Sequence, residues 1–492
     1  MLLATALYLP SLGHPFVIDD EVYIGENSAV VDGVPLGRYL FDRDTTAARA
    51  DFAWQSYRPL RTIAFRLLVA AFGVRPLPFG VANLALYALC IALTALLALR
   101  LTGDRPAALA AAALWALWPV HVEPVVYASA LGDHLSLVMQ LAAFFAAARA
   151  VTERRLAAAA AVASLLAAAL AMAAKEMAIT EGPILAVAAA LAWRRLASDG
   201  RRRAVALLAA HALVTVGFLA LRTHVIGAVG QGAITSLTAR IAARAVPIYL
   251  WKYLALVLAP LGHAAAYAAV PLERWRAALA WAGVAAVALA LWRARRPTLT
   301  FAVAWFALAL LPVLHVVPLL AYYADRFALV PSVGLALAMA VALAALPPRI
   351  RRVAWFGAGA LALLYAAALP LEARAWRDEV TLWSHAVDVQ PEAALAQSNL
   401  GTSLLRARRP DDALTHLQAA RRLAGGGAIL SLQIAIADEE LGRFADAEAA
   451  VRASLAEREL ADAHRFYARL LQRRGDAAGA ARELERARTR GR

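Results

Sequence analysis

The chain of 492 residues is 62% hydrophobic, with a mean hydropathy of +0.60, whereas ordinary soluble domains are about half apolar or less. This composition excludes a soluble globular protein and predicts a polytopic membrane protein. The formal net charge of +15 would suggest nucleic acid binding in a soluble chain, but the arginines cluster between apolar runs, as in cytoplasmic loops. We therefore expect no nucleic acid partner. The single cysteine, Cys90, excludes an intrachain disulfide and a Cys-rich zinc site.

Apolar runs dominate the first three quarters of the chain. Residues 1–12 lack the positive start and the cleavage pattern of a signal peptide, and we expect a first, short membrane helix there. The polar segment 14–80 follows, and its helical pieces are expected to be amphipathic and to lie on the membrane surface. Later runs, several of them near the roughly 20 residues that cross a bilayer, cover 81–101, 107–119, 131–150, 156–173, 177–193, 204–221, 277–292, 298–317, 327–346 and 353–370.

Three arginine clusters orient these runs. The loop 194–203 contains five arginines and is the clearest cytoplasmic marker, and two further clusters lie at 293–296 and 349–352. All three lie on one side only if the region 223–262, with its apolar run at 245–262, makes no net crossing. We therefore expect about eleven net crossings, with the loop 14–80 and the C-terminus outside. The Leu-, Ala- and Arg-rich composition is typical of a GC-rich bacterial genome, which predicts a bacterial inner (cytoplasmic) membrane and a periplasmic site.

The composition changes at about residue 371, where charges return and amphipathic helical patterns replace apolar runs. Ala413, Ala447 and Ala481 recur at the 34-residue period of tetratricopeptide repeats. We expect residues 1–370 to form a helical membrane domain and 371–492 a solenoid of about three repeats after a leading half repeat. The fold class is therefore all-α. Unrelated amphipathic helices are the alternative for the second domain.

Adjacent carboxylates follow the first apolar run. Asp19 and Asp20 could act as a general base or hold a metal. Because consecutive residues cannot both face the same way in regular structure, we expect one to face a cavity and the other to cap the following helix or to pair with a cation.

Other ionisable residues gather on the expected external side, beside or within the membrane runs, where such groups tend to be functional. Anchoring at the water boundary is the simpler alternative for any one of them. Arg58, Lys175 and Arg326 could bind a phosphate. His121 and Glu123 are bounded by prolines, so a loop could aim both inwards, but they lack the further partners that a metal needs. We expect no metal and no cofactor. The remaining candidates on this side are Asp133, Glu176 and Asp325.

Several short motifs follow one another in an order that resembles a known family. They are Phe16-Val17-Ile18-Asp19-Asp20, Tyr57-Arg58-Pro59-Leu60, Asn83-Leu84, Val120-His121-Val122-Glu123, Ala174-Lys175-Glu176, Asp325-Arg326-Phe327 and Leu329-Val330-Pro331-Ser332-Val333-Gly334. With the closing repeats, the set resembles the transmembrane and tetratricopeptide-repeat (TMTC-like) O-mannosyltransferases. This chain departs from them at Trp118 and Tyr87, where members of the family often carry His.

The resemblance implies a GT-C glycosyltransferase fold, a polyprenyl-phosphate sugar donor and an acidic pair that carries the catalytic base. Asp19 is then the first choice for the base and Asp20 the second. The other matched residues would line the donor phosphate site or hold its loops; together with Asp133 they are Arg58, His121, Glu123, Lys175, Glu176, Asp325 and Arg326.

The expected function is inverting transfer of a mannose-like hexose from that lipid to a hydroxyl of an exported protein, which the repeats would present. The alternatives are transfer to a lipid or a polysaccharide, a non-catalytic scaffold that gathers partners through its repeats, and a transporter. A transporter would be expected to show an internal repeat of its span pattern, and the sequence has none.

Overall fold

The computed structural model describes residues 2–48, 56–227, 236–316 and 323–490. These residues form helices and turns, without a strand among them. The chain divides into two compact units: residues 1–263 and 270–377 form the first, and residues 264–269 and 378–492 form the second.

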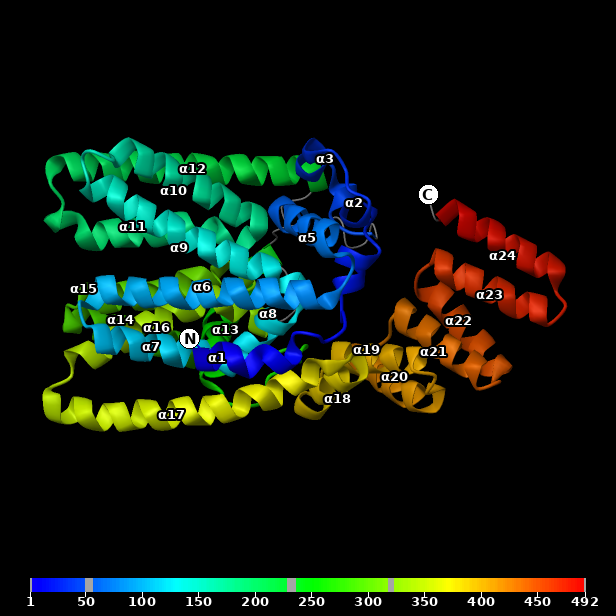
Figure 1. Ribbon diagram of the computed structural model, residues 1–492. Coiled ribbons are helices and arrows are strands. Elements are labelled where there is room, and N and C mark those ends of the chain that lie inside the picture. The colour runs from blue at the N-terminus through cyan, green and yellow to red at the C-terminus, as the bar shows by residue number, and fades with distance from the viewer. Residues whose placement is uncertain (1, 49–55, 228–235, 317–322, 491–492) are drawn as a thin grey trace. The chain divides into compact units, whose positions relative to one another are not determined.

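The first unit contains the apolar helices (Figure 1). It opens with α1 (Leu2–Tyr8) and the short helices α2 (Ser28–Val31), α3 (Leu36–Phe41) and α5 (Pro59–Phe72). The remaining helices of this unit are α6 (Pro76–Thr102), α7 (Arg105–Leu117), the short α8 (Val122–Val126), α9 (Leu131–Thr152), α10 (Ala157–Ala174), α11 (Glu181–Ala192), α12 (Ser198–Ile226), α13 (Ser236–Leu258), α14 (Arg274–Ala294), α15 (Pro297–Leu310), α16 (Leu329–Ala345) and α17 (Pro348–Arg374).

Among the described residues, nine helices are long and apolar enough to cross a membrane, so the chain is a multi-pass membrane protein. The expected span at 107–119 has a different form. Helix α7 ends at Leu117, and the chain bends by 58° before it continues from Pro119 to Val126. The cause is local, since the residue before a proline disfavours helical geometry and Trp118 is extended. Counted as one span, this bent pair gives a tenth candidate.

The two ends of the first unit differ in which segments they collect. The connection after α1, the short helices α2, α3, α5 and α8, and the turn between α10 and α11 lie at one end, which we call the site end (Figure 1). The turns that carry the three arginine clusters lie between α11 and α12, between α14 and α15, and between α16 and α17. They lie at the opposite end, which we call the arginine end (Figure 1). The ionisable residues that the sequence singles out therefore share one end of the bundle.

The polar segment after α1 is held by an apolar core of its own. Tyr23, Ile24 and Val30 are buried against Phe65 of α5 and Phe79 of α6. Gly80 allows a close approach of α6 to this segment, because a Cβ there would lie 2.8 Å from the carbonyl oxygen of Leu12. These contacts fix the acidic loop relative to the membrane helices.

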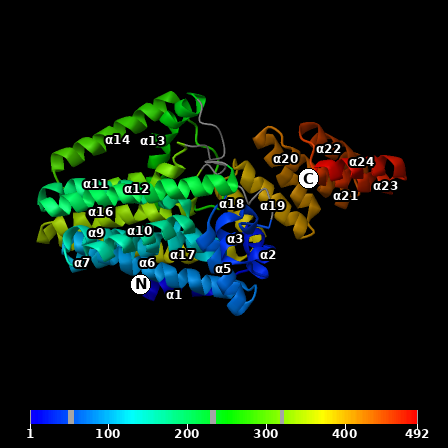
Figure 2. The same ribbon diagram turned by 90° about the horizontal axis from the view of Figure 1, so that it is seen from above.

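Helix α13 covers most of the region for which no net crossing is expected. By length and composition its part from Arg240 to Leu258 is a candidate span. It also packs against α14 (Figure 2), where Trp281 donates a hydrogen bond to the carbonyl of Ala243 and Trp251 donates one to the carbonyl of Ala280. The absence of a net crossing stays a prediction.

The second unit is a series of helices: α18 (Glu379–Val389), α19 (Ala394–Arg406), α20 (Pro410–Ala424), α21 (Ala428–Glu440), α22 (Phe444–Glu457), α23 (Ala461–Arg473) and α24 (Ala477–Arg490). Helices α19 and α20, α21 and α22, and α23 and α24 pack as successive pairs. Gly401 permits close packing in the first pair, because a Cβ there would lie 2.6 Å from the side chain of Leu417. Whether the pairs are tetratricopeptide repeats stays a prediction.

The three alanines of the 34-residue period differ in burial. Ala413 and Ala447 are fully buried, whereas Ala481 is exposed and the buried alanine at that place in the last pair is Ala480. The reason is that α24 begins one residue earlier than a strict period would place it. The predicted domain boundary at 370/371 lies inside α17, which continues through Pro370 to Arg374.

Candidate active site

A strained turn presents the two adjacent carboxylates. Ile18 has a φ of 57°, which β-branched residues rarely adopt. The backbone N–H of Asp20 donates to the carbonyl of Val17, and the N–H of Val17 donates to the Asp20 Oδ2 at 3.1 Å. This closed turn sends the two acids to different environments, since Asp20 is 1% exposed and Asp19 is partly exposed.

Asp20 ties the acidic loop to the start of α9. Its Oδ1 accepts a hydrogen bond from the N–H of Ser129 at 2.8 Å. Burial raises the pKa of this carboxyl to about 7, although the bonds from Ser129 and Val17 favour the charged form. Asp20 occupies the N-cap position of the helix Glu21–Gly25, but its side chain makes no capping hydrogen bond there. Whether Asp19 caps a helix or pairs with a cation stays a prediction.

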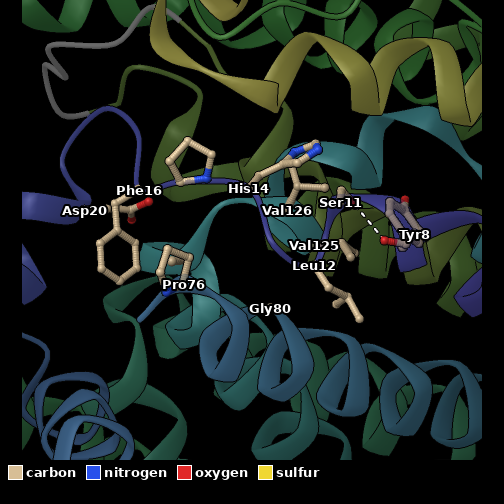
Figure 3. Close-up of a pocket in the computed structure, with 12 residues that line it drawn as sticks. Tyr8, Ser11, Leu12, His14, Phe16, Asp20, Pro76, Gly80, Val125 and Val126 are labelled. Carbon is tan, nitrogen blue, oxygen red and sulfur yellow. Dashed lines mark hydrogen bonds between the residues drawn. The ribbon is translucent and has the colours of Figure 1, made fainter. Parts of the chain in front are cut away.

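A small pocket lies beside Asp20 (Figure 3). It is lined by the connection after α1, by the start of α6 and by α8. Asp20 stands at one end with Phe16, and Tyr8 stands at the other, where the Ser11 hydroxyl donates to the carbonyl of Tyr8 at 2.7 Å (Figure 3). Asp20 therefore borders a hollow, whereas Asp19 is not among the residues that line this one.

Two ion pairs form where α5, α9 and the turn after α10 come together. Arg58 holds Glu176 through two parallel hydrogen bonds, Nε to Oε2 and Nη2 to Oε1, each of 2.7 Å. This bidentate arrangement is the strongest form of such a pair. Next to it in the chain, Lys175 forms an ion pair with Asp133, and both side chains are almost fully buried.

A third pair connects α8 with the segment before α16. Glu123, which is 1% exposed, forms an ion pair with the Arg326 guanidinium and accepts the backbone N–H of Arg326 at 2.9 Å. The ring of Phe327 joins the pairs, because the Lys175 Nζ lies 5.2 Å and the Arg326 Cζ 5.0 Å from its centroid. Burial lowers the pKa of Lys175, and the nearby Arg58 and Arg326 charges add to that effect. The structure thus brings all three phosphate-binding candidates into one cluster.

Asp325 has a partner that the sequence reasoning missed. Its Oδ2 lies 2.8 Å from the Nδ1 of His263, which is buried and whose Nε2 lies 3.1 Å from the carbonyl of Ala259. Burial alone would lower the pKa of His263, but the Asp325 carboxylate raises it, to about 9. The only available signal was a histidine in the short polar gap after the apolar run at 245–262.

Tyr127 connects the acidic loop with the cations. Burial raises the pKa of its hydroxyl, and the carboxylates of Asp19 and Asp20 raise it further, while the Arg326 guanidinium lowers it. The hydroxyl therefore lies within electrostatic range of all three. Tyr127 ends helix α8, immediately after the predicted polar motif, so its place in the chain was a usable signal.

His121 lies apart from these charges. It is fully buried, its Nδ1 lies 2.9 Å from the hydroxyl of Tyr87, and its Nε2 lies 3.0 Å from the hydroxyl of Ser332. Trp115 also donates to the Ser332 hydroxyl, at 2.8 Å. His121 and Glu123 both point inwards, as the sequence suggested, since both are buried, but only Glu123 reaches the ion-pair cluster. Within the described ranges, no group of three or more His, Cys, Asp or Glu side chains is arranged to hold a metal ion.

Comparison with known proteins finds partial matches. No family model matches the chain. It is 34% identical over 153 residues to protein O-mannosyl-transferase Tmtc1 of Drosophila melanogaster, a stretch of 31% of this chain and 18% of that protein. It is 30% identical over 148 residues to human protein O-mannosyl-transferase TMTC3, a stretch of 30% of this chain and 16% of that protein. The chain therefore matches less than a fifth of the length of these relatives.

Among solved structures, the chain is similar to ArnT from Cupriavidus metallidurans bound to undecaprenyl phosphate, with 18% identity and a TM-score of 0.42. That match covers 92% of this chain and 78% of ArnT. The sequence resemblance to the TMTC-like protein O-mannosyltransferases, which the motifs indicate, is confirmed by the curated relatives over about three tenths of the chain.

Proposed function

We propose that this chain is a membrane glycosyltransferase that moves a sugar from a polyprenyl-phosphate donor to an acceptor hydroxyl, with inversion. The observation that carries the proposal is the cluster at the site end. There Arg58, Lys175 and Arg326 come from three distant parts of the sequence, and each is held by a carboxylate. Groups fixed in this way before the substrate arrives can stabilise charge on a leaving phosphate without rearranging.

Asp19 acts as the general base. Its partly exposed position suits contact with an acceptor, whereas both oxygens of Asp20 already accept backbone N–H groups. In the reaction, the acceptor oxygen gives its proton to Asp19 and bonds to the anomeric carbon. The bond from that carbon to the phosphate oxygen breaks, and its electron pair leaves with the polyprenyl phosphate. Asp20 positions the loop, and the cation cluster stabilises the departing phosphate.

The relatives support a proposal for the sugar and the acceptor. The names of Tmtc1 and TMTC3 as protein O-mannosyl-transferases support a mannose-like hexose and a protein acceptor. The helix pairs of the second unit, as tetratricopeptide repeats, would present that acceptor or a glycan. The site end would face the periplasm of a bacterial inner membrane, in a GT-C topology of about eleven net crossings.

A transfer assay tests the proposal. The full chain in lipid nanodiscs is supplied with polyprenyl-phosphate mannose that carries a radiolabelled sugar, together with envelope extract from a host that lacks the gene. We expect label in the protein fraction, and no label with Asp19→Asn. Label only in the lipid or polysaccharide fraction would assign a different acceptor. No label in any fraction, with a donor confirmed to be active, would contradict the transferase and favour the scaffold.

A further inference from the structure

The three candidate phosphate-binding cations are all neutralised in the structure. Glu176, Asp133 and Glu123 each hold one of them. An anionic phosphate that approached these pairs would meet carboxylates as well as cations. The site therefore needs a positive charge that no carboxylate already compensates.

Arg61 carries such a charge. It is 1% exposed, and among the described residues no carboxylate lies within ion-pair distance of its guanidinium. Its contacts are a 3.4 Å hydrogen bond to the Ser56 hydroxyl and the rings of Tyr23 and Phe65, whose centroids lie 4.2 and 5.4 Å from its Cζ. Its Nε is buried without a hydrogen-bond partner in the described structure.

A buried charge without a counterion is unfavourable, and proteins normally pair such groups. Burial lowers the pKa of Arg61, and the neighbouring Arg58 charge lowers it further, while the Glu176 carboxylate, which is already paired with Arg58, raises it by less than these two effects lower it. The charged guanidinium is therefore disfavoured in the ligand-free site. A bound anion would remove this disadvantage and would use the donors that Arg61 leaves unfilled.

Arg61 also stands where an anion could be bound by several groups. It is the third residue of the fourteen-residue helix α5, three residues after Arg58, which precedes the helix and whose charge acts on Arg61. No side chain caps this helix terminus, and after Pro59, which has no N–H, its first N–H groups lack intrahelical partners. The Arg61 stem packs at Gly132, where a Cβ would lie 3.1 Å from Arg61 Cδ and 2.8 Å from the carbonyl oxygen of Ala174. Gly132 and Ala174 directly precede Asp133 and Lys175 in the chain, so Arg61 packs beside the Lys175–Asp133 ion pair.

We propose that Arg61 supplies the uncompensated positive charge that binds the phosphate of the lipid-linked donor, at the N-terminus of α5 and beside Arg58. The inference rests on the proposed function for the identity of the lipid. One net positive charge matches the single negative charge of a sugar phosphodiester. The product phosphate has a higher negative charge, so the same arginine stabilises the leaving group as the sugar departs.

Direct binding tests this role without any transfer reaction. Full-length protein in nanodiscs is titrated with undecaprenyl phosphate, with undecaprenol and with inorganic phosphate, and the thermal unfolding midpoint and apparent Kd are measured. We expect undecaprenyl phosphate to raise the midpoint, and the other two probes to have little effect. Arg61→Met keeps an unbranched stem against Tyr23 and should weaken binding of undecaprenyl phosphate at least tenfold. Arg61→Gln serves as a second neutral variant should the methionine variant not fold.

The controls separate binding from structure. Arg75, which is exposed at the start of α6, loses the same charge in Arg75→Met and should bind as the wild type does. Arg61→Lys keeps the charge without the planar fork and should bind with intermediate affinity. The ligand-free unfolding midpoint of Arg61→Met should equal or exceed that of the wild type, because an uncompensated buried charge has gone.

Two results would overturn the inference: wild-type affinity in Arg61→Met, or no binding by the wild type. Wild-type affinity combined with a lower ligand-free midpoint would make Arg61 a structural support for the helix Glu21–Gly25, which contains Tyr23. An equal response to inorganic phosphate would assign the site to free phosphate instead of the lipid. Wild-type protein that binds the lipid phosphate through Arg61 but transfers no sugar would contradict the proposed function and leave this inference in place.

Discussion

Charged residues collect at both ends of the membrane unit, and the difference between the ends lies in burial. At the site end, the side chains of Lys175 and Asp133 are 4% and 6% exposed. At the arginine end, the Arg154–Asp199 pair has a separation of 3.4 Å, and its side chains are 86% and 52% exposed. Exposed pairs contribute little to stability, whereas breaking a buried pair leaves a charge without compensation. Topology accounts for the exposed arginines, but the buried pairs require another reason, and a substrate site provides one.

The largest expected effect is the loss of the proposed general base at the site end. Asp19→Asn should lower sugar transfer about 10²- to 10⁴-fold, the usual contribution of a general base, without changing the thermal unfolding midpoint. The matched control is Asp44→Asn in the same polar segment, where the side chain is 74% exposed. Transfer rates from labelled donor and unfolding curves of the three proteins test this. Equal transfer by Asp19→Asn and the wild type would remove Asp19 from the chemistry.

The next effect compares one broken pair at each end. Asp133→Asn leaves the Lys175 ammonium buried without its partner and should lower the free energy of unfolding by about 3–5 kcal/mol. Glu153→Gln breaks the exposed Arg149–Glu153 pair at the arginine end and should change it by about 0.5 kcal/mol or less. Both are measured by denaturation in the same detergent. Similar losses for the two variants would contradict the distinction between the ends.

A pH series tests the pair between His263 and Asp325. The folded-state pKa of His263 is raised to about 9, above its unfolded value of about 6.5, so the protonated histidine stabilises the fold. That stabilisation is fully present below about pH 6.5 and is lost as the pH rises through about 9. The loss should be on the order of 3 kcal/mol.

His263→Gln is the variant that isolates this titration. Glu372 is the other acid that acts on the histidine, and it remains in the variant. Thermal unfolding midpoints between pH 6 and pH 9.5 should fall for the wild type and stay flatter for His263→Gln. Parallel curves for the two proteins would assign the pH dependence to other groups.

Much of the fold was predictable because it depends on the periodicity of apolar residues and on runs of arginine. Counting spans predicted that four of the site residues lie at the same end of the membrane unit, namely Arg58, Lys175, Glu176 and Arg326. The end of the apolar run at Trp118 and Pro119 was predicted, because a proline marks a helix boundary. The 58° bend and the helical continuation to Val126 were not predicted, because the sequence does not show how the chain packs after the break. The one-residue shift to Ala480 likewise depends on where the last hairpin begins, which the period alone does not determine.

The site was predictable as a set of residues but not as a set of pairs. The local sequence predicts that the side chains of Asp19 and Asp20 point in different directions. It does not reveal that the backbone N–H of Ser129, far along the chain, donates a hydrogen bond to Asp20. His121 and Glu123 are two residues apart and point into different surroundings. The sequence did not single out Arg61, which lies just outside the motif Tyr57-Arg58-Pro59-Leu60. That its guanidinium has no carboxylate partner among the described residues can be seen only in the packed structure.

The smallest effect concerns the Asp104–Arg351 pair at the arginine end, which is less exposed than the Arg154–Asp199 and Arg149–Glu153 pairs. Asp104 lies 2.8 Å from Arg351, with side chains 17% and 29% exposed, and it also caps α7 through the N–H of Ala107 at 3.0 Å. Asn caps a helix about as well as Asp, so Asp104→Asn removes the charge pair and keeps the cap. We expect a loss of about 0.5–1 kcal/mol in low salt, which disappears at high ionic strength. Asp104→Ala should lose about 1 kcal/mol more in both conditions, since it removes the cap as well. A salt-independent loss of several kcal/mol in Asp104→Asn would mean that this pair behaves like the buried pairs of the site end, and burial would no longer distinguish the two ends.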